Sequence, residues 1–128
     1  MVARGKKRDA DSRPARLLTA VAGHLADDVG AEVFRLVNER VRLGILSALA
    51  VSSPMSFGQL KATLEVTDGN LSVHTRKLED AGFIACRKSF RDRRPLTEYS
   101  LTAKGRAAFE HYLDHMQSLI EMMKESKP

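Results

Sequence analysis

The stretch from Thr67 to Gly82 constrains the fold more than any other part of this sequence. It begins with a residue that caps helices, Thr67 or Asp68, and ends at a glycine, the favoured residue after a helix C-terminus. Between them runs a narrow apolar seam at helical spacing, made of Leu71, Thr75, Leu78 and Ala81. The pattern therefore predicts a helix that packs along one side only.

The opposite side of this helix carries amide, hydroxyl, methyl and cationic groups, which suit base edges and phosphates in a DNA major groove. These groups belong to Asn70, Ser72, Val73, Arg76 and Lys77. The alternative is an ordinary amphipathic surface helix, because polar residues on a solvated face need no function. The choice between the two depends on the neighbouring segments.

The segment before this helix predicts a core helix and a short capped helix. Apolar residues recur at helical spacing over 31–51, with Asn38 as a break or cap, and the part from Glu39 to Val51 is the expected core helix. Met55-Ser56 predicts a very short strand, and Ser56 caps a short helix that follows. Residues 65–67 then turn the chain into the Thr67–Gly82 helix, which predicts a helix-turn-helix.

After Gly82 the pattern changes from helical to alternating. One β-rich run holds Phe83, Ile84 and Cys86, a second spans 96–101, and a charged turn centred on residues 91–95 joins them, which predicts a hairpin. Its arginines suit a phosphate backbone or a minor groove better than burial.

Thr102 then caps a long last helix. The apolar stripe of this helix is longer than a small core could cover, so a subunit interface and a two-fold dimer are expected.

The N-terminal segment lies outside this pattern. Residues 1–13 are predicted to form a disordered basic tail, and residues 14–128 a single domain. Apolar residues at helical spacing predict a first helix from Pro14 to about Val29, which would pack on another helix or a second subunit. There is no hydrophobic run long enough for a membrane span and no signal-peptide pattern, so a cytoplasmic location is expected.

The charge is concentrated in two segments. The chain has a net charge of +5. Residues 1–16 hold six basic and two acidic side chains (+4), residues 87–106 hold seven and two (+5), and the remainder is therefore −4. Local rather than average charge is what phosphate contacts with counterion release require, so the pattern indicates a bound polyanion. A membrane surface fits less well, because neither segment is interleaved with Leu, Phe and Trp.

The order of helix, helix-turn-helix, basic hairpin and long helix is that of a winged helix, and several motifs resemble bacterial winged-helix regulators of the MarR/ArsR type. The motifs are R-x-x-I-L-x-x-L from Arg42, S-F-x-x-L-K from Ser56, the Thr67–Gly82 stretch, K-S-F from Lys88, and Thr97–Phe109. The resemblance implies a mainly α fold with a small β-hairpin (α+β). It further implies that the DNA contacts come from Asn70, Ser72, Val73, His74, Arg76, Lys77, Lys88, Arg91, Arg93 and Arg94.

Other reactive side chains carry weaker signals. His74 fits a neutral histidine hydrogen-bonded near the helix-turn-helix core, or a phosphate donor, better than a metal ligand. His111 and His115 have the i, i+4 spacing of a metal pair but lack a third placed ligand, so solvated helix residues are favoured and no metal or cofactor is expected. The cations beside Cys86 would lower a thiol pKa and suit a redox sensor, yet a small buried strand residue is the commoner case.

An enzymatic function has little support, since the sequence lacks a Gly-rich phosphate loop, H-E-x-x-H, C-x-x-C and a nucleophile elbow.

The motifs, the charge pattern and the resemblance together predict a homodimeric, sequence-specific regulator of transcription, a repressor that binds double-stranded DNA. The alternative is a winged helix used as a protein-interaction module without sequence-specific DNA binding, because fold alone does not fix function.

Overall fold

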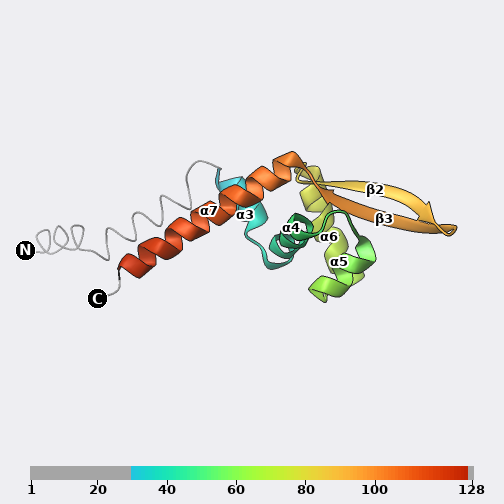
Figure 1. The fold of residues 1–128 in the computed structure, drawn as a ribbon, viewed down its shortest axis with the longest axis horizontal. Coiled ribbons are helices and arrows are strands. Elements are labelled where there is room, and N and C mark those ends of the chain that lie inside the picture. Colours follow the sequence, from blue (N-terminus) through green and yellow to red (C-terminus); the bar gives the residue numbers. More distant parts are fainter. Residues whose placement is uncertain (1–29, 127–128) are drawn as a thin grey trace, which may run out of the picture. The chain divides into compact units, whose positions relative to one another are not determined.

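The computed structural model describes residues 30–126 (Figure 1). The elements in chain order are α3 (Ala31–Val37), α4 (Arg40–Val51), β1 (Met55–Ser56), α5 (Phe57–Leu64), α6 (Asp68–Asp80), β2 (Ile84–Arg91), β3 (Arg94–Leu101) and α7 (Ala103–Glu125). Arg35–Glu110 forms one compact unit, and the remaining described residues belong to a second. The tail predicted for residues 1–13 and the helix predicted for 14–29 lie outside the described residues.

The predicted break at Asn38 separates α3 from α4. Glu39 is the N-cap of α4, and its Oε1 accepts a hydrogen bond from the backbone N–H of Arg42 at 2.8 Å. This cap satisfies one of the donors that every helix N-terminus leaves unpaired. The inner face of α4 supplies much of the core of this unit through Val41, Ile45, Leu46 and Leu49.

The predicted helix-turn-helix is α5 and α6. Ser56 and Gln59 form a capping box at the start of α5, with the Ser56 hydroxyl accepting from the Gln59 N–H at 3.0 Å. Glu65 ends α5 in the left-handed conformation, with φ of 54°. Thr67 then caps α6 by accepting from the Asn70 N–H at 3.1 Å. The predicted seam of α6 is confirmed, since its Leu71, Thr75 and Leu78 side chains are buried.

Gly82 terminates α6 as predicted. Its φ is +79°, its N–H donates to the Glu79 carbonyl at 2.8 Å, and the Phe83 N–H donates to the Leu78 carbonyl at 2.9 Å. These two bonds are those of a Schellman motif, and the accompanying apolar contact pairs Phe83 with Leu78, both buried. The motif turns the chain directly from α6 into the hairpin.

The strands form one antiparallel sheet in the order β1-β3-β2. The short strand predicted at Met55-Ser56 is confirmed, because Met55 pairs with Tyr99. The hairpin is longer than the sequence pattern indicated: β2 and β3 pair from Ile84 and Leu101 out to Arg91 and Arg94. The turn is therefore only Asp92-Arg93, at the centre of the predicted turn, and the placing of residues 91, 94 and 95 in that turn was wrong. Figure 1 shows this hairpin projecting beyond α4, α5 and α6.

The start of α7 is fixed against the end of α6. The Thr102 hydroxyl accepts from the Gly105 N–H at 2.9 Å, which confirms the predicted cap, and it contacts the carbonyls of Gly82 and Phe83 at 2.7 and 3.0 Å. Gly105 lies so close to Phe83 that a Cβ there would be 1.9 Å from the Phe83 oxygen. In the second unit, the Phe34 and Tyr112 rings pack with centroids 5.4 Å apart.

Candidate nucleic-acid interface

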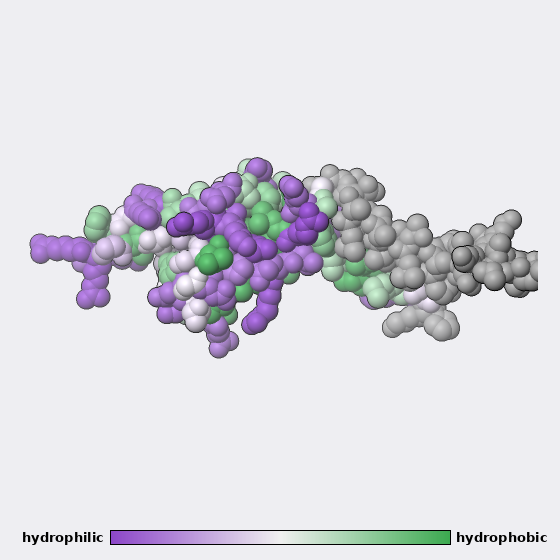
Figure 2. Space-filling model, turned by 180° about the vertical axis from the view of Figure 1, so that it is seen from behind, coloured by the Kyte–Doolittle hydropathy of each residue, from purple (hydrophilic) through white to green (hydrophobic). Residues whose placement is uncertain are grey.

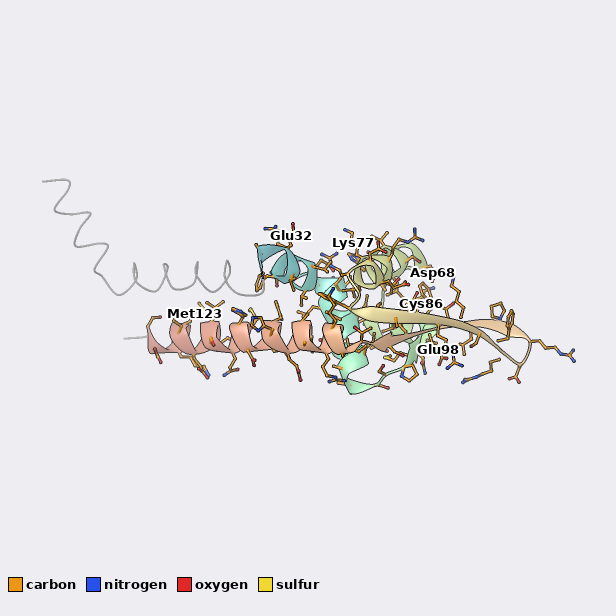
Figure 3. All side chains as sticks on the ribbon, turned by 90° about the horizontal axis from the view of Figure 1, so that it is seen from above. Glu32, Asp68, Lys77, Cys86, Glu98 and Met123 are labelled. Carbon is orange, nitrogen blue, oxygen red and sulfur yellow. The ribbon has the colours of Figure 1, made fainter. Side chains whose placement is uncertain are left out.

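The outer face of α6 presents its polar side chains to solvent. Asn70, Ser72, Arg76 and Lys77 are exposed, and Val73 is 52% exposed, which is high for an apolar side chain. Because the seam of Leu71, Thr75 and Leu78 holds the other face against the core, these five side chains project from a helix with a fixed orientation. Figure 3 marks this helix by Asp68 in its first turn and Lys77 in its last.

His74 differs from these residues because it is largely enclosed. Its side chain is 13% exposed, and its Nδ1 lies 3.0 Å from the Arg42 guanidinium and 3.5 Å from Glu39 Oε1. The Nδ1 atom therefore lies between a guanidinium, which only donates hydrogen bonds, and a carboxylate, which only accepts them. This arrangement matches the first of the two roles predicted for His74, beside the helix-turn-helix core, and a phosphate contact stays a prediction.

Arg42 is the residue that the sequence analysis did not identify as structural. It is 9% exposed on α4, and besides His74 it donates from Nε to the Leu36 carbonyl and from a terminal nitrogen to the Arg35 carbonyl at 3.5 Å. The signal was present: residues 42, 45, 46 and 49 follow one helical stripe, so the arginine falls on the buried face. Arg42 thereby links the end of α3, the start of α4 and the recognition helix.

Glu39 completes this cluster as an ionised carboxylate. Burial alone would raise the pKa of Glu39, but the backbone hydrogen bonds from Arg42 and Val41, together with the nearby His74 and Arg42, outweigh it and lower the pKa below the ordinary value. The carboxylate therefore stays charged at neutral pH, where it caps α4 and balances the buried guanidinium.

The hairpin carries the second cationic surface. Lys88, Arg91, Arg93 and Arg94 are all exposed. The two-residue turn holds Asp92 and Arg93 at φ of 51° and 65°, the geometry of a type I′ turn, in which glycine is the common second residue. Arg93, held in this left-handed conformation, places a cation at the outermost point of the hairpin. Hydrophilic side chains project from this end of the molecule in Figure 2, on the left.

A groove of about 590 Å³ separates α6 from the hairpin. Ser72 and Arg76 line it from the helix, and Lys88 and Thr97 line it from the strands. The buried Tyr99 hydroxyl shares a hydrogen bond with Thr75, which joins β3 to α6 at the base of the groove. Of the predicted contact residues, the groove thus brings together Ser72, Arg76 and Lys88, and the acidic Glu79 and Asp80 line it as well.

Cys86 lies in the same groove, where Figure 3 labels it on β2. Burial raises the pKa of the Cys86 thiol above its ordinary value, and the carboxylate of Glu79 raises it further, while Lys88 and a hydrogen bond with Tyr99 act in the opposite direction. The neighbouring cation Lys88 thus lowers the pKa as expected, but burial and Glu79 outweigh it, and the net shift is upward. The sequence predicts that Lys88 lies near Cys86, but it does not reveal Glu79, which approaches from α6 across the groove.

His111 and His115 do meet on α7, with their Nε2 atoms 3.1 Å apart. The two imidazoles therefore face each other across one turn of the helix, with ring centroids 4.6 Å apart. Within residues 30–126 no group of three or more His, Cys, Asp or Glu side chains is arranged to hold a metal ion. None of the helices in that range is long and apolar enough to cross a bilayer.

The capped helix α6 and the cationic hairpin beside it are the parts expected of a winged helix, and a comparison with known families agrees. The model of a family described as a winged helix DNA-binding domain matches residues 41–120. The chain belongs to this family. The predicted winged-helix fold and the motif resemblance are both confirmed, and the match implies DNA binding by a family whose members are typically not enzymes.

Individual proteins similar to this chain agree with its assignment to the winged-helix family. An uncharacterized protein of Methanocaldococcus jannaschii is 40% identical over 79 residues, which is 62% of this chain and 86% of that protein. A transcriptional regulator homologue from Pyrococcus horikoshii has a similar structure, with a TM-score of 0.67, 29% identity and coverage of 73% of this chain and 94% of the other. A MarR-family regulator from Silicibacter pomeroyi shares the fold, with a TM-score of 0.55 at 21% identity over 88% of this chain and 73% of the other.

Proposed function

We propose that this winged-helix protein is a sequence-specific regulator of transcription that binds double-stranded DNA as a homodimer and acts as a repressor. The observation that carries the proposal is that an exposed cation of α6, Arg76, and an exposed cation of the hairpin, Lys88, line a single groove. This arrangement suits α6 in the major groove of DNA and the hairpin, which is the wing of the fold, on the adjacent backbone or in the minor groove. The regulator homologue of Pyrococcus horikoshii supports the same function.

Individual residues take different roles in this proposal. Asn70, Ser72, Val73, Arg76 and Lys77 face the major groove, where amides and guanidinium groups read base edges. Lys88, Arg91, Arg93 and Arg94 contact phosphates and fix the register without reading sequence. His74 orients α6 through Arg42, and a phosphate contact from its ring is the second role proposed for it.

The homodimer is proposed from the apolar side chains on α7. Leu113, Ile120 and Met123 are 46%, 45% and 55% exposed, and residues 113 and 120 lie two turns apart on one side of the helix. A two-fold axis through such a stripe would present two recognition helices to half-sites about one turn of DNA apart. A dimer bound over a promoter excludes other proteins from that site, so repression needs no further surface.

Fluorescence-anisotropy titrations with genomic duplex fragments, over a salt series and with unlabelled random DNA as competitor, test the proposal. Wild type is expected to keep a preferred duplex in the presence of competitor and to show a steep salt dependence. Arg76→Ala should weaken the preferred duplex by about 1–3 kcal/mol and relax its specificity, whereas Arg93→Ala should weaken all duplexes alike and reduce the salt slope by about 1.

Arg40→Ala is the matched control, since it removes one positive charge from an exposed side chain at the start of α4, outside the proposed DNA contacts and the proposed dimer interface. It should bind as wild type does. Binding that the competitor abolishes would contradict sequence-specific recognition and favour the protein-interaction module. An equal loss for Arg76→Ala on preferred and random DNA would contradict its base-reading role.

A further inference from the structure

Phe90 is an aromatic side chain that the fold leaves in solvent. It is 75% exposed on β2, while the other phenylalanines, Phe34, Phe57, Phe83 and Phe109, are buried or partly buried. Its position near the end of the hairpin is remote from the core, so packing within this unit does not explain it. One exposed apolar side chain needs no explanation by itself, so the neighbours of Phe90 decide whether it marks a contact surface.

The register gives Phe90 an apolar neighbour. Phe90 pairs directly with Pro95, one step inside the Arg91–Arg94 pair that closes the turn. A two-residue turn makes its closing pair hydrogen-bonded, so the next pair is a non-hydrogen-bonded one, in which the opposing side chains approach most closely. Pro95 has no N–H to donate, and β1 pairs only as far as Glu98, so no ladder bond of the sheet is lost.

Phe90 and Pro95 together, hereafter the wing pad, lie on the face of the hairpin that borders the groove. Side chains alternate between the faces of a strand, so Phe90 shares its face with Lys88 and Cys86. Lys88 and Cys86 line the groove beside α6. The wing pad therefore extends the same wall outward, toward the turn and its exposed arginines.

We propose that the wing pad makes an apolar contact with deoxyribose in the minor groove next to the half-site that α6 reads. This inference rests on the proposed function. The surrounding cations Lys88, Arg91, Arg93 and Arg94 favour a polyanion over an apolar protein surface, and the walls of a minor groove are the least polar part of that polyanion. Proteins that enter minor grooves commonly combine arginine with apolar side chains in this way.

A neutral contact has a signature that a phosphate contact lacks. It releases no counterions, so its loss lowers affinity without changing the salt slope. Phe90→Ala is expected to weaken binding to the preferred duplex by about 10-fold, consistent with partial burial of one aromatic side chain. Phe90→Leu should retain most of the affinity, because it keeps apolar volume at the same position.

The experiment combines titration over a salt series with hydroxyl-radical footprinting of wild type, Phe90→Ala, Phe90→Leu and Val51→Ala on the preferred duplex. Hydroxyl radicals attack deoxyribose from the minor groove, so Phe90→Ala should lose protection beside each half-site while keeping the rest of the footprint. Val51→Ala is the matched control, because Val51 is 89% exposed at the end of α4 and outside both contact surfaces.

Unchanged affinity and footprint for Phe90→Ala would overturn the wing pad while leaving the proposed function intact. A reduced salt slope equal to that of Arg93→Ala would also overturn it, because Phe90 would then act only by positioning cations. Wild type that binds no preferred duplex would contradict the proposed function itself, which none of the Phe90 results would do.

Discussion

At the scale of single residues, Arg42 has the greatest structural consequence. Its guanidinium is buried, and it donates to two carbonyls near the end of α3 and to the His74 ring on the recognition helix. A buried charge is tolerated only where hydrogen bonds replace its hydration, and here carbonyl oxygens, an imidazole and the nearby Glu39 do so. The orientation of α6 therefore depends on a hydrogen bond from a side chain outside the helix-turn-helix.

Arg42→Lys tests this dependence while preserving the charge. Lysine lacks the planar fork that reaches several acceptors at once, so we expect the free energy of unfolding to fall by about 1.5–3 kcal/mol in urea titrations. Arg40→Lys is the matched control, because Arg40 is exposed at the start of the same helix and its replacement should stay within about 0.5 kcal/mol. Equal stability of the two variants would show that the Arg42 network contributes little.

Residue patterns predicted which side chains face outward, but not which ones meet across the fold. The positions of Asn70, Arg76 and Lys77 followed from helical periodicity, which is a local property of the sequence. The Arg42–His74 contact joins residues that are 32 positions apart. The direction of the Cys86 pKa likewise depends on Glu79, a neighbour only in three dimensions.

At the scale of elements, the helix ends were the most predictable features and the hairpin ends the least. Thr67, Ser56, Gly82 and Thr102 cap or terminate their helices as expected, because capping depends on residues within three or four positions. The outer hairpin is exposed on both faces, so its residues need not alternate in polarity. Pro95 was therefore interpreted as part of the turn, although it lies in β3.

The junction of α6, β2 and α7 makes Gly105 irreplaceable in its present geometry. A Cβ at this position would be 1.9 Å from a backbone oxygen, which no side-chain rotation relieves. Gly105→Ala is expected to destabilise the fold by about 3 kcal/mol, the upper end of the range for overpacking, as measured by thermal and urea unfolding.

Gly69→Ala is the control for the loss of a helical glycine. Gly69 lies in α6 with no heavy atom within 4 Å of the added Cβ, so alanine should be neutral or stabilising by up to about 1 kcal/mol through helix propensity. If Gly105→Ala unfolds like Gly69→Ala, the close approach of α7 to Phe83 is not needed for stability.

At the scale of the whole molecule, the proposed function requires two copies of the chain. One recognition helix covers only a few base pairs, whereas linked binding of two half-sites raises affinity by about 10²–10⁴-fold without any new contact. The exposed apolar side chains of α7 are the described surface that best serves this linkage, since they belong to a 23-residue helix and repeat along it. A variant that no longer dimerises should therefore also bind DNA more weakly.

The double variant Leu113→Glu with Ile120→Glu tests this coupling, because it places like charges on the proposed interface while Leu113 and Ile120 are already half exposed. Sedimentation is expected to show a dimer for wild type and a monomer for the variant, and affinity for the preferred duplex should fall at least about 100-fold. Asp114→Lys changes the charge by the same two units at an exposed position about 100° around the helix from Leu113, and should change neither property. A monomeric wild type that still prefers one duplex would contradict the dimer and leave recognition to a single α6 and wing.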